Sequence, residues 1–153
     1  GASPYLATPL PVVEAMLRLA EVKPGETVYD LGCGDGRILV TAVEKFGARG
    51  VGVELDKEVL ALARENVRQH ALEQRVRLMQ GNMFAADVRP ADVVALYLLP
   101  EALGRLRPLL ERQLRPGARV VTHDFPIPGW QAARTEKLAR GDGTFHTIHL
   151  YRR

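Results

Sequence analysis

The sequence has one cysteine and no long apolar run, and each shortage excludes a class of protein. Cys33 alone can form neither an internal disulfide nor a cysteine-rich metal site. No apolar segment approaches the roughly 18–20 residues that a membrane-spanning helix needs. The 153 residues are 46% hydrophobic and 25% charged, which is typical of one folded domain rather than of a disordered chain.

The net charge of +3 is unevenly distributed. Residues 1–100 carry 11 Lys and Arg against 13 Asp and Glu, a net charge of −2, whereas residues 101–153 carry 10 against 5, a net charge of +5. This basic excess favours an acidic or phosphate-bearing partner near the C-terminal part. The alternative is a hydrated surface in an arginine-rich chain, since 17 of the 21 basic residues are arginine.

Strand and helix patterns alternate along the chain. β-Branched segments predict strands at 27–31, 50–54, 75–80, 91–97, 118–123, 133–139 and 144–151. Apolar spacing predicts helices at 12–20, at 37–46, after Asp56 and at 101–114. We expect Thr8 and Asp56 to act as N-caps. The fold class is therefore α/β: a doubly wound, Rossmann-like, mostly parallel seven-stranded sheet with a C-terminal antiparallel hairpin and helices on both faces.

The first residues of the sequence bear on where the protein is expected to be located. The start Gly1-Ala2-Ser3 lacks an initiator methionine, which is typical of a tag remnant or a trimmed terminus. We expect a single domain over 1–153 with an irregular lead-in at 1–11. We also expect a cytoplasmic protein, or a membrane-associated one if an N-terminal segment has been removed.

A glycine-rich turn follows the first expected strand. Its pattern, D-x-G-x-G-x-G, is formed by Asp30, Gly32, Gly34 and Gly36. Glycines let the backbone turn sharply and approach a ligand, and free N–H groups of the next helix point to the same place. The turn is not a phosphate loop, because G-K-[ST] is missing. It also departs from the dinucleotide fingerprint, because Arg37 stands where a glycine is required.

Polar residues at the ends of the first three strands indicate which ligand would fit. Asp30 would repel a pyrophosphate but suits a ligand with an ammonium group. Glu54 can accept two hydrogen bonds from a ribose diol. After the third strand, Asn82 can bond an adenine edge and Met83 can pack on the ring. Ammonium, ribose and adenine without a phosphate together describe S-adenosylmethionine.

These motifs, in this order, resemble those of the class I S-adenosylmethionine-dependent methyltransferases. The resemblance rests on 28–36, 52–56 and 81–84 and extends over 12–151. It implies that Asp30 and the glycine turn hold the methionine part, that Glu54 binds the ribose and that position 82 contacts the adenine. Asn82 departs from the aspartate common there. The expected cofactor site comprises Asp30, Gly32, Cys33, Gly34, Asp35, Gly36, Glu54, Leu55, Asn82, Met83, Tyr5 and Thr8.

Several kinds of methyl acceptor are disfavoured by what is missing. Amino groups on planar bases or amides are usually held by [DN]-P-P-[YF], whereas the corresponding segment here reads L-Y-L-L-P at 96–100. Methylation of cytosine C5 uses a cysteine nucleophile, but Cys33 lies in the glycine turn. Catechol-type transfer needs a metal, and we expect no metal site. Basic and aromatic residues also do not form a strip of the kind that stacks on RNA.

Two further segments resemble a narrower group, the small protein-lysine methyltransferases related to those acting on the ATP synthase c-subunit and the adenine nucleotide translocase. These are G-D-G-R-I at 34–38 and F-P-I-P-G-W at 125–130, accompanied by a lead-in whose Tyr5 and Thr8 can fold over the cofactor. His123 and Asp124 depart from that group, as does Asn82. The resemblance to this narrower group implies a lysine substrate.

Candidate substrate and catalytic residues follow the fourth and fifth strands. Phe125 and Trp130 can wall a slot for an aliphatic stem with a cationic tip, together with Leu99 and Pro100 at the end of the fourth strand. The alternative for Trp130 is packing against the sheet.

Three residues are candidates for handling the amine. Asp124 or His123 can take a proton from an ammonium, and Tyr97 can orient the amine. Alternatively, His123 bonds the backbone and Tyr97 closes the core. The other histidines, His70, His146 and His149, are expected to be surface or strand residues.

The sequence thus predicts an S-adenosylmethionine-dependent methyltransferase that acts on a lysine of a protein partner and releases S-adenosylhomocysteine. One alternative is transfer to RNA or to a small molecule, although a nucleic-acid partner is not favoured. The other is a non-catalytic subunit that binds S-adenosylmethionine. The oligomeric state is not defined by the sequence.

Overall fold

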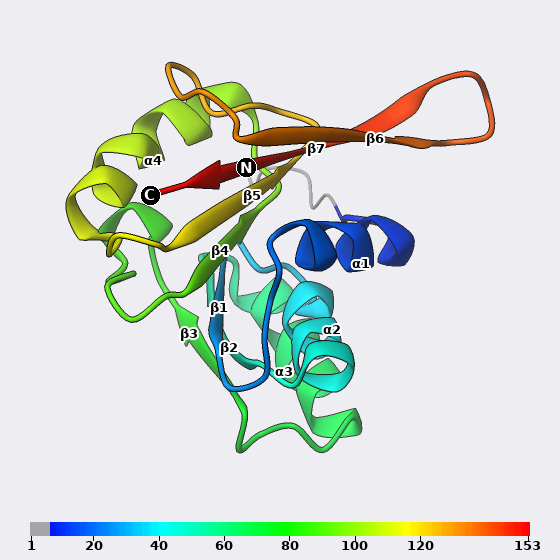
Figure 1. The fold of residues 1–153 in the computed structure, drawn as a ribbon. Coiled ribbons are helices and arrows are strands. Elements are labelled where there is room, and N and C mark those ends of the chain that lie inside the picture. The colour runs from blue at the N-terminus through cyan, green and yellow to red at the C-terminus, as the bar shows by residue number, and fades with distance from the viewer. Residues whose placement is uncertain (1–6) are drawn as a thin grey trace.

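The computed structural model describes residues 7–153, which form one mixed sheet flanked by helices (Figure 1). The elements are α1 (Leu10–Leu19), β1 (Thr27–Leu31), α2 (Arg37–Phe46), β2 (Arg49–Glu54), α3 (Lys57–Gln69), β3 (Val76–Gln80), the 3₁₀ turn η1 (Met83–Ala85), β4 (Val93–Leu96), α4 (Pro100–Gln113), β5 (Arg119–His123), β6 (Arg134–Ala139) and β7 (Phe145–Arg152).

The sheet has the topology predicted from the sequence. Its seven strands lie in the order β3-β2-β1-β4-β5-β7-β6. Strands β1 to β5 are parallel, and β7 runs antiparallel between β5 and β6. The strand order reverses at β1, which pairs with both β2 and β4. In open α/β sheets, ligands bind outside the carboxyl ends of the strands at such a reversal.

Helices cover both faces of the sheet (Figure 1). Helices α1, α2 and α3 lie on one face, where buried Leu17 and Leu39 contribute to one apolar core. Helix α4 covers the other face, and its buried Leu106 packs in a second core with Tyr29 and Leu31 of β1. Because side chains alternate along a strand, Asp30 points to the opposite face from Tyr29 and Leu31.

One expected helix cap is confirmed and one is wrong. Asp56 caps α3, and its side chain accepts from the N–H groups of Glu58 and Val59. Thr8 does not cap α1, because Pro9 occupies the N-cap position and the helix begins at Leu10. The Thr8 hydroxyl instead lies 3.1 Å from His123 Nδ1, and Pro11, the third residue after Thr8, has no N–H to donate to a cap.

The close packing of β2 behind the glycine turn yields a stability prediction. A Cβ on Gly52 would come within 2.7 Å of Leu39 Cδ1 and within 2.9 Å of both Cys33 Sγ and Leu78 Cδ2. Gly52→Ala should therefore lower the free energy of unfolding by about 1–3 kcal/mol, as overpacked cores do. Urea unfolding measures this change. The matched control is Gly81→Ala, since a Cβ added at Gly81 would have nothing within 4 Å. Equal stabilities of the two variants would contradict the packing argument.

Candidate active site

The glycine turn is fixed to the adjacent strand by its backbone. The N–H groups of Gly32 and Cys33 both donate to the Val53 carbonyl of β2, at 2.8 and 3.0 Å. Gly36 then begins α2 as its N-cap, with φ of 81° in the left-handed region and no side-chain cap. A glycine is favoured there, because other residues adopt this conformation only at a cost. The turn therefore presents backbone, not side chains, to the space beyond β1.

Asp30 is a buried carboxylate at the carboxyl end of β1, with 3% of its surface exposed. Burial raises the pKa of Asp30 well above its ordinary value, and the negative charges of Glu54 and Asp35 raise it further. No basic side chain among residues 7–153 contributes an opposing effect on this pKa. A carboxylate in such surroundings is stabilised by a cation, and an α-ammonium group of a ligand fits this requirement.

Glu54 connects β2 to the glycine turn. Its Oε1 accepts from the Gly34 N–H at 3.0 Å, and its Oε2 accepts from the Asp56 N–H at 3.0 Å. A carboxylate can accept about four hydrogen bonds. Each oxygen of Glu54 therefore keeps one free lone pair, and the half-buried side chain can accept from both hydroxyls of a ribose diol.

The expected adenine contacts lie at the ends of β2 and β3. Asn82 is exposed, and its Oδ1 accepts from the Phe84 N–H at 2.9 Å, which makes it the cap of η1. Leu55 is 68% exposed, and Met83 is half-buried against the α4 side of the sheet. The side-chain oxygen of Asn82 is thus already used within the turn. Adenine contacts by these three residues stay a prediction.

A small cleft brings many of the predicted residues together. It is lined by Ala7, Thr8, Asp30, Gly32, Cys33, Gly34, Asp35, Arg37, Ile38 and Tyr97. Arg37, which the sequence analysis did not include in the site, connects two walls of this cleft. Its guanidinium pairs with Asp35 at 2.8 Å and donates to the Thr8 carbonyl at 3.2 Å. Tyr5 lies outside the described residues.

Cys33 is a structural rather than a reactive cysteine. It is 5% exposed, and burial together with the negative charges of Asp30 and Glu54 raises the pKa of its thiol. A thiol with a raised pKa carries little of the thiolate that nucleophilic chemistry needs. Cys33 therefore fills space behind the glycine turn.

Tyr97 and His123, at the ends of β4 and β5, form a stack beside the cleft. Their ring centroids lie 4.0 Å apart, and only Tyr97 lines the cleft. His123 is 1% exposed, and Thr8 Oγ1 lies 3.1 Å from its Nδ1. Burial lowers the pKa of His123 to about 4. The ring nitrogens of His123 thus contact side chains, and the alternative of a hydrogen bond to the backbone is not what the structure shows.

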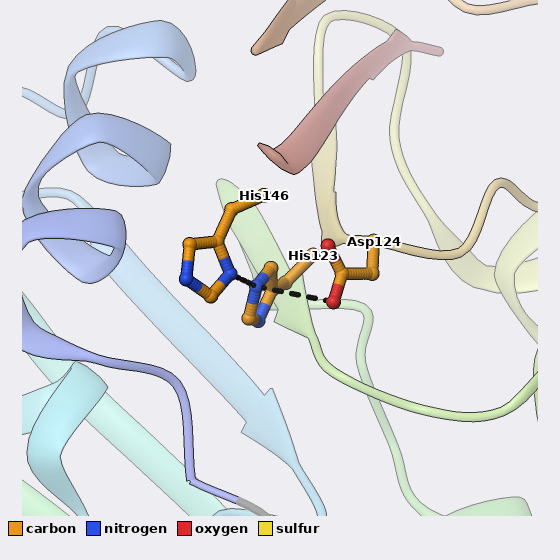
Figure 2. Close-up of side chains that lie close together, drawn as sticks. All are labelled: His123, Asp124 and His146. Atoms are coloured by element: carbon orange, nitrogen blue, oxygen red, sulfur yellow. Dashed lines mark hydrogen bonds and ion pairs between the residues drawn. The ribbon is translucent and has the colours of Figure 1, made fainter. Parts of the chain in front are cut away.

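Two more side chains meet His123 at its Nε2 atom (Figure 2). His146 Nδ1 lies 2.8 Å from His123 Nε2, and Asp124 Oδ2 lies 3.5 Å from the same nitrogen. His146 is a strand residue as expected, but it is half-buried against His123 rather than on an open surface. Strand register could have revealed it, since His123 pairs with Ile148 and residues 146 and 148 share a face.

Trp130 follows the alternative expected for it and packs against the sheet. Its ring centroid lies 5.7 Å from that of Tyr151, and its Nε1 donates to Glu111 of α4 at 2.9 Å. Tyr151 pairs with Val120, three residues before the carboxyl end of β5. Trp130 therefore lies on the α4 side of the sheet, as Phe125 does, and a substrate slot formed by the two stays a prediction.

The remaining substrate candidates lie near the ends of β4 and β5. Leu99 is 58% exposed and precedes α4, which begins at the exposed Pro100. Phe125 is half-buried, and its N–H donates to the His123 carbonyl at 2.8 Å. Substrate contacts by these three residues stay predictions. None of the helices described within 7–153 is both long and apolar enough to cross a membrane.

Comparison with known proteins identifies the family. A family model described as the ANTKMT methyltransferase domain matches residues 30–134. A protein-lysine N-methyltransferase of Saccharolobus islandicus is 42% identical over 97% of this chain and 92% of that protein. The adenine nucleotide translocase lysine N-methyltransferase of Mus musculus is 36% identical over 84% of this chain but only 56% of its own length.

A solved structure agrees with this assignment. The crystal structure of an RNA methyltransferase from Salinibacter ruber in complex with S-adenosyl-L-homocysteine has a TM-score of 0.90 and 44% sequence identity, and covers 96% of this chain and 93% of that chain. The predicted family, α/β fold and methyltransferase class are thereby confirmed. The chain belongs to the ANTKMT family of class I S-adenosylmethionine-dependent methyltransferases.

Proposed function

We propose that this methyltransferase transfers the methyl group of S-adenosylmethionine to a lysine side chain of a protein. The observation that carries the proposal is the relative named a protein-lysine N-methyltransferase, which is 42% identical and matches this chain over almost the whole length of both proteins. A further relative is named for the same chemistry on the adenine nucleotide translocase.

The residues at the carboxyl ends of the strands fit S-adenosylmethionine. Asp30 offers a buried carboxylate for the α-ammonium group, the glycine turn leaves room for the backbone of the ligand, and Glu54 keeps two lone pairs for the ribose. When bound, S-adenosylmethionine supplies a methyl group on a sulfonium, whose leaving group needs no further activation. The protein then has mainly to align the acceptor and to accept its unprotonated form.

Tyr97 is the residue that we propose for contact with the incoming amine. It lines the cleft next to Asp30 and Gly32, and the buried His123 supports its ring from behind. His123 is accordingly a positioning residue in this proposal. A role of His123 or Asp124 as proton acceptor stays a prediction, as does a cytoplasmic location.

RNA is the second candidate substrate, because the Salinibacter ruber structure, 44% identical, is named an RNA methyltransferase. The basic excess in 101–153 supported a phosphate-bearing partner, but the structure reduces its weight. Six of its ten basic residues form ion pairs with acidic side chains: Arg107, Arg115, Arg119, Arg134, Arg140 and Arg152. Charges neutralised in this way contribute less to binding a polyanion.

Labelling of a host extract distinguishes the two substrates. The protein is incubated with methyl-labelled S-adenosylmethionine and extract, and the product is treated with protease or with nuclease. We expect label that is released by protease and resists nuclease. Label lost only to nuclease would contradict the lysine proposal and favour RNA. No label in either fraction would instead support the non-catalytic alternative, which the methyltransferase names of the relatives argue against.

A further inference from the structure

We propose that His123, Asp124 and His146 form a binding site for one divalent transition-metal ion, with Zn²⁺ as the best-fitting ion. The three side chains come from the end of β5, the residue after it and the second residue of β7 (Figure 2). One ligand atom from each residue can be chosen so that all three lie within 4.8 Å of one another. Among residues 7–153, this is the one group of three histidine, cysteine or acidic side chains whose ligand atoms lie this close together.

The spacing of the ligand atoms suits a tetrahedral ion. Bond lengths of about 2.0–2.1 Å to zinc place neighbouring ligand atoms about 3.4 Å apart. His123 Nε2 lies 3.5 Å from Asp124 Oδ2 and 2.8 Å from His146 Nδ1. The carboxylate oxygen therefore already lies at a suitable distance from His123, and within 4.8 Å of the His146 ligand atom. The two imidazoles need to separate by only about half an ångström, which exchanges their mutual hydrogen bond for two bonds to the ion.

The groups around the cluster already orient it. A metal-bound histidine usually bonds an oxygen through its second ring nitrogen, and Thr8 Oγ1 lies 3.1 Å from His123 Nδ1. The Thr147 N–H donates to Asp124 Oδ1 at 3.2 Å, while the Asp124 N–H donates to the Thr147 carbonyl at 2.6 Å. These contacts leave Asp124 Oδ2 directed at His123, as coordination requires.

The backbone of Asp124 supports a functional constraint at this position. Its φ is 63°, a left-handed conformation that non-glycine residues seldom adopt. This turn directs the side chain back toward His123, although it directly follows β5. Such conformations concentrate at functional sites, where the surrounding structure enforces them.

Arg140 competes with the proposed metal ion for the carboxylate of Asp124. Its Nη2 donates to Asp124 Oδ2 at 3.2 Å, so the guanidinium and the ion would share one oxygen. The Arg140 side chain is 37% exposed and can turn toward solvent. Removing its charge should therefore strengthen metal binding, which a purely structural hydrogen-bond network does not predict.

The donor set selects the class of ion. Two imidazoles and one carboxylate suit zinc, cobalt or nickel better than magnesium or calcium, which prefer all-oxygen sites. Three protein ligands leave a fourth position open. A bound ion would join β5, β7 and Thr8 beside the cleft that Tyr97 lines.

Calorimetric titration of tag-free, chelator-treated protein with Zn²⁺ tests the proposal. We expect one ion per chain, at least tenfold weaker binding in His146→Ala and tighter binding in Arg140→Gln. The matched control, His70→Ala, removes an exposed histidine that pairs with Glu44 and should bind as the wild type does. Absence of stoichiometric binding, or equal binding by wild type and His146→Ala, would overturn the site. If His146→Ala fails to fold, unchanged or weaker binding by Arg140→Gln would overturn it instead.

Discussion

Replacing Asp30 by asparagine should stabilise the ligand-free protein and weaken its binding of S-adenosylmethionine by roughly 30- to 1,000-fold. Both effects have one cause, because the carboxylate is buried beside two other acidic groups and no basic side chain within residues 7–153 offsets its raised pKa. Removing the charge ends the cost of burying it beside Glu54 and Asp35. The same change removes the partner that we propose for the ligand's α-ammonium group.

The stabilising effect should depend on pH in a defined direction. An aspartate in an unfolded chain has a pKa near ~3.9, and in the folded protein the pKa of Asp30 is raised. The folded state therefore holds its proton more tightly, so the wild type loses stability as pH rises from the ordinary pKa through the folded one. The asparagine variant has no such loss, because its side chain does not titrate. The advantage of Asp30→Asn should thus be smallest near pH 4 and grow toward neutral pH.

Thermal unfolding across pH and calorimetry with S-adenosylhomocysteine measure the two effects. The matched control is Asp87→Asn, which changes an exposed carboxylate whose pair is the nearby exposed Arg89. It should alter neither quantity appreciably. Tight ligand binding by Asp30→Asn, or a stability advantage that shrinks with rising pH, would contradict the role given to Asp30.

The second large effect is expected at Glu54. Glu54→Ala removes acceptors for the Gly34 and Asp56 N–H groups together with the proposed ribose contacts. Affinity for S-adenosylhomocysteine should fall by about 10- to 100-fold, the loss expected for hydrogen bonds to a charged group. Glu58→Gln, an exposed residue in the first turn of α3, should bind the ligand as the wild type does.

A ligand without the ribose hydroxyls separates direct contact from support of the turn. If Glu54 bonds the diol, the wild type should discriminate strongly against a 2′,3′-dideoxy analogue of S-adenosylhomocysteine, and Glu54→Ala should not. The two losses would then be non-additive, as for groups in contact. Fully additive losses would restrict Glu54 to holding Gly34 and Asp56.

Much of the fold was predictable because its signals are local. The bounds of β1 and α2 match the sequence prediction, since Gly36 and Gly47 mark both ends of α2 with positive φ. The expected strand 91–97 is shorter, at Val93–Leu96. Apolar residues continue beyond the carboxyl end of β4, at Tyr97, Leu98 and Leu99, so composition alone does not show where its pairing with β1 stops.

The sequence predicts the residues around the glycine turn much better than it predicts the residues around His123. The residues around the glycine turn are close in sequence and have a fixed spacing, so the sequence predicts Asp30, Gly32 and Gly34 as site residues. His146 and Arg140 reach His123 and Asp124 only through the antiparallel pairing of β5, β7 and β6. Trp130 shows the opposite case, where a family-like motif packs against the sheet instead.

The most direct test of the central claim is the chemical identity of the methylated product. Protein labelled in extract by the wild type is hydrolysed to amino acids and analysed by mass spectrometry, with Asp30→Asn as the inactive control. The account predicts label in methylated lysine and almost none with Asp30→Asn. Label in a methylated nucleoside or in another amino acid, or equal labelling by Asp30→Asn, would contradict it.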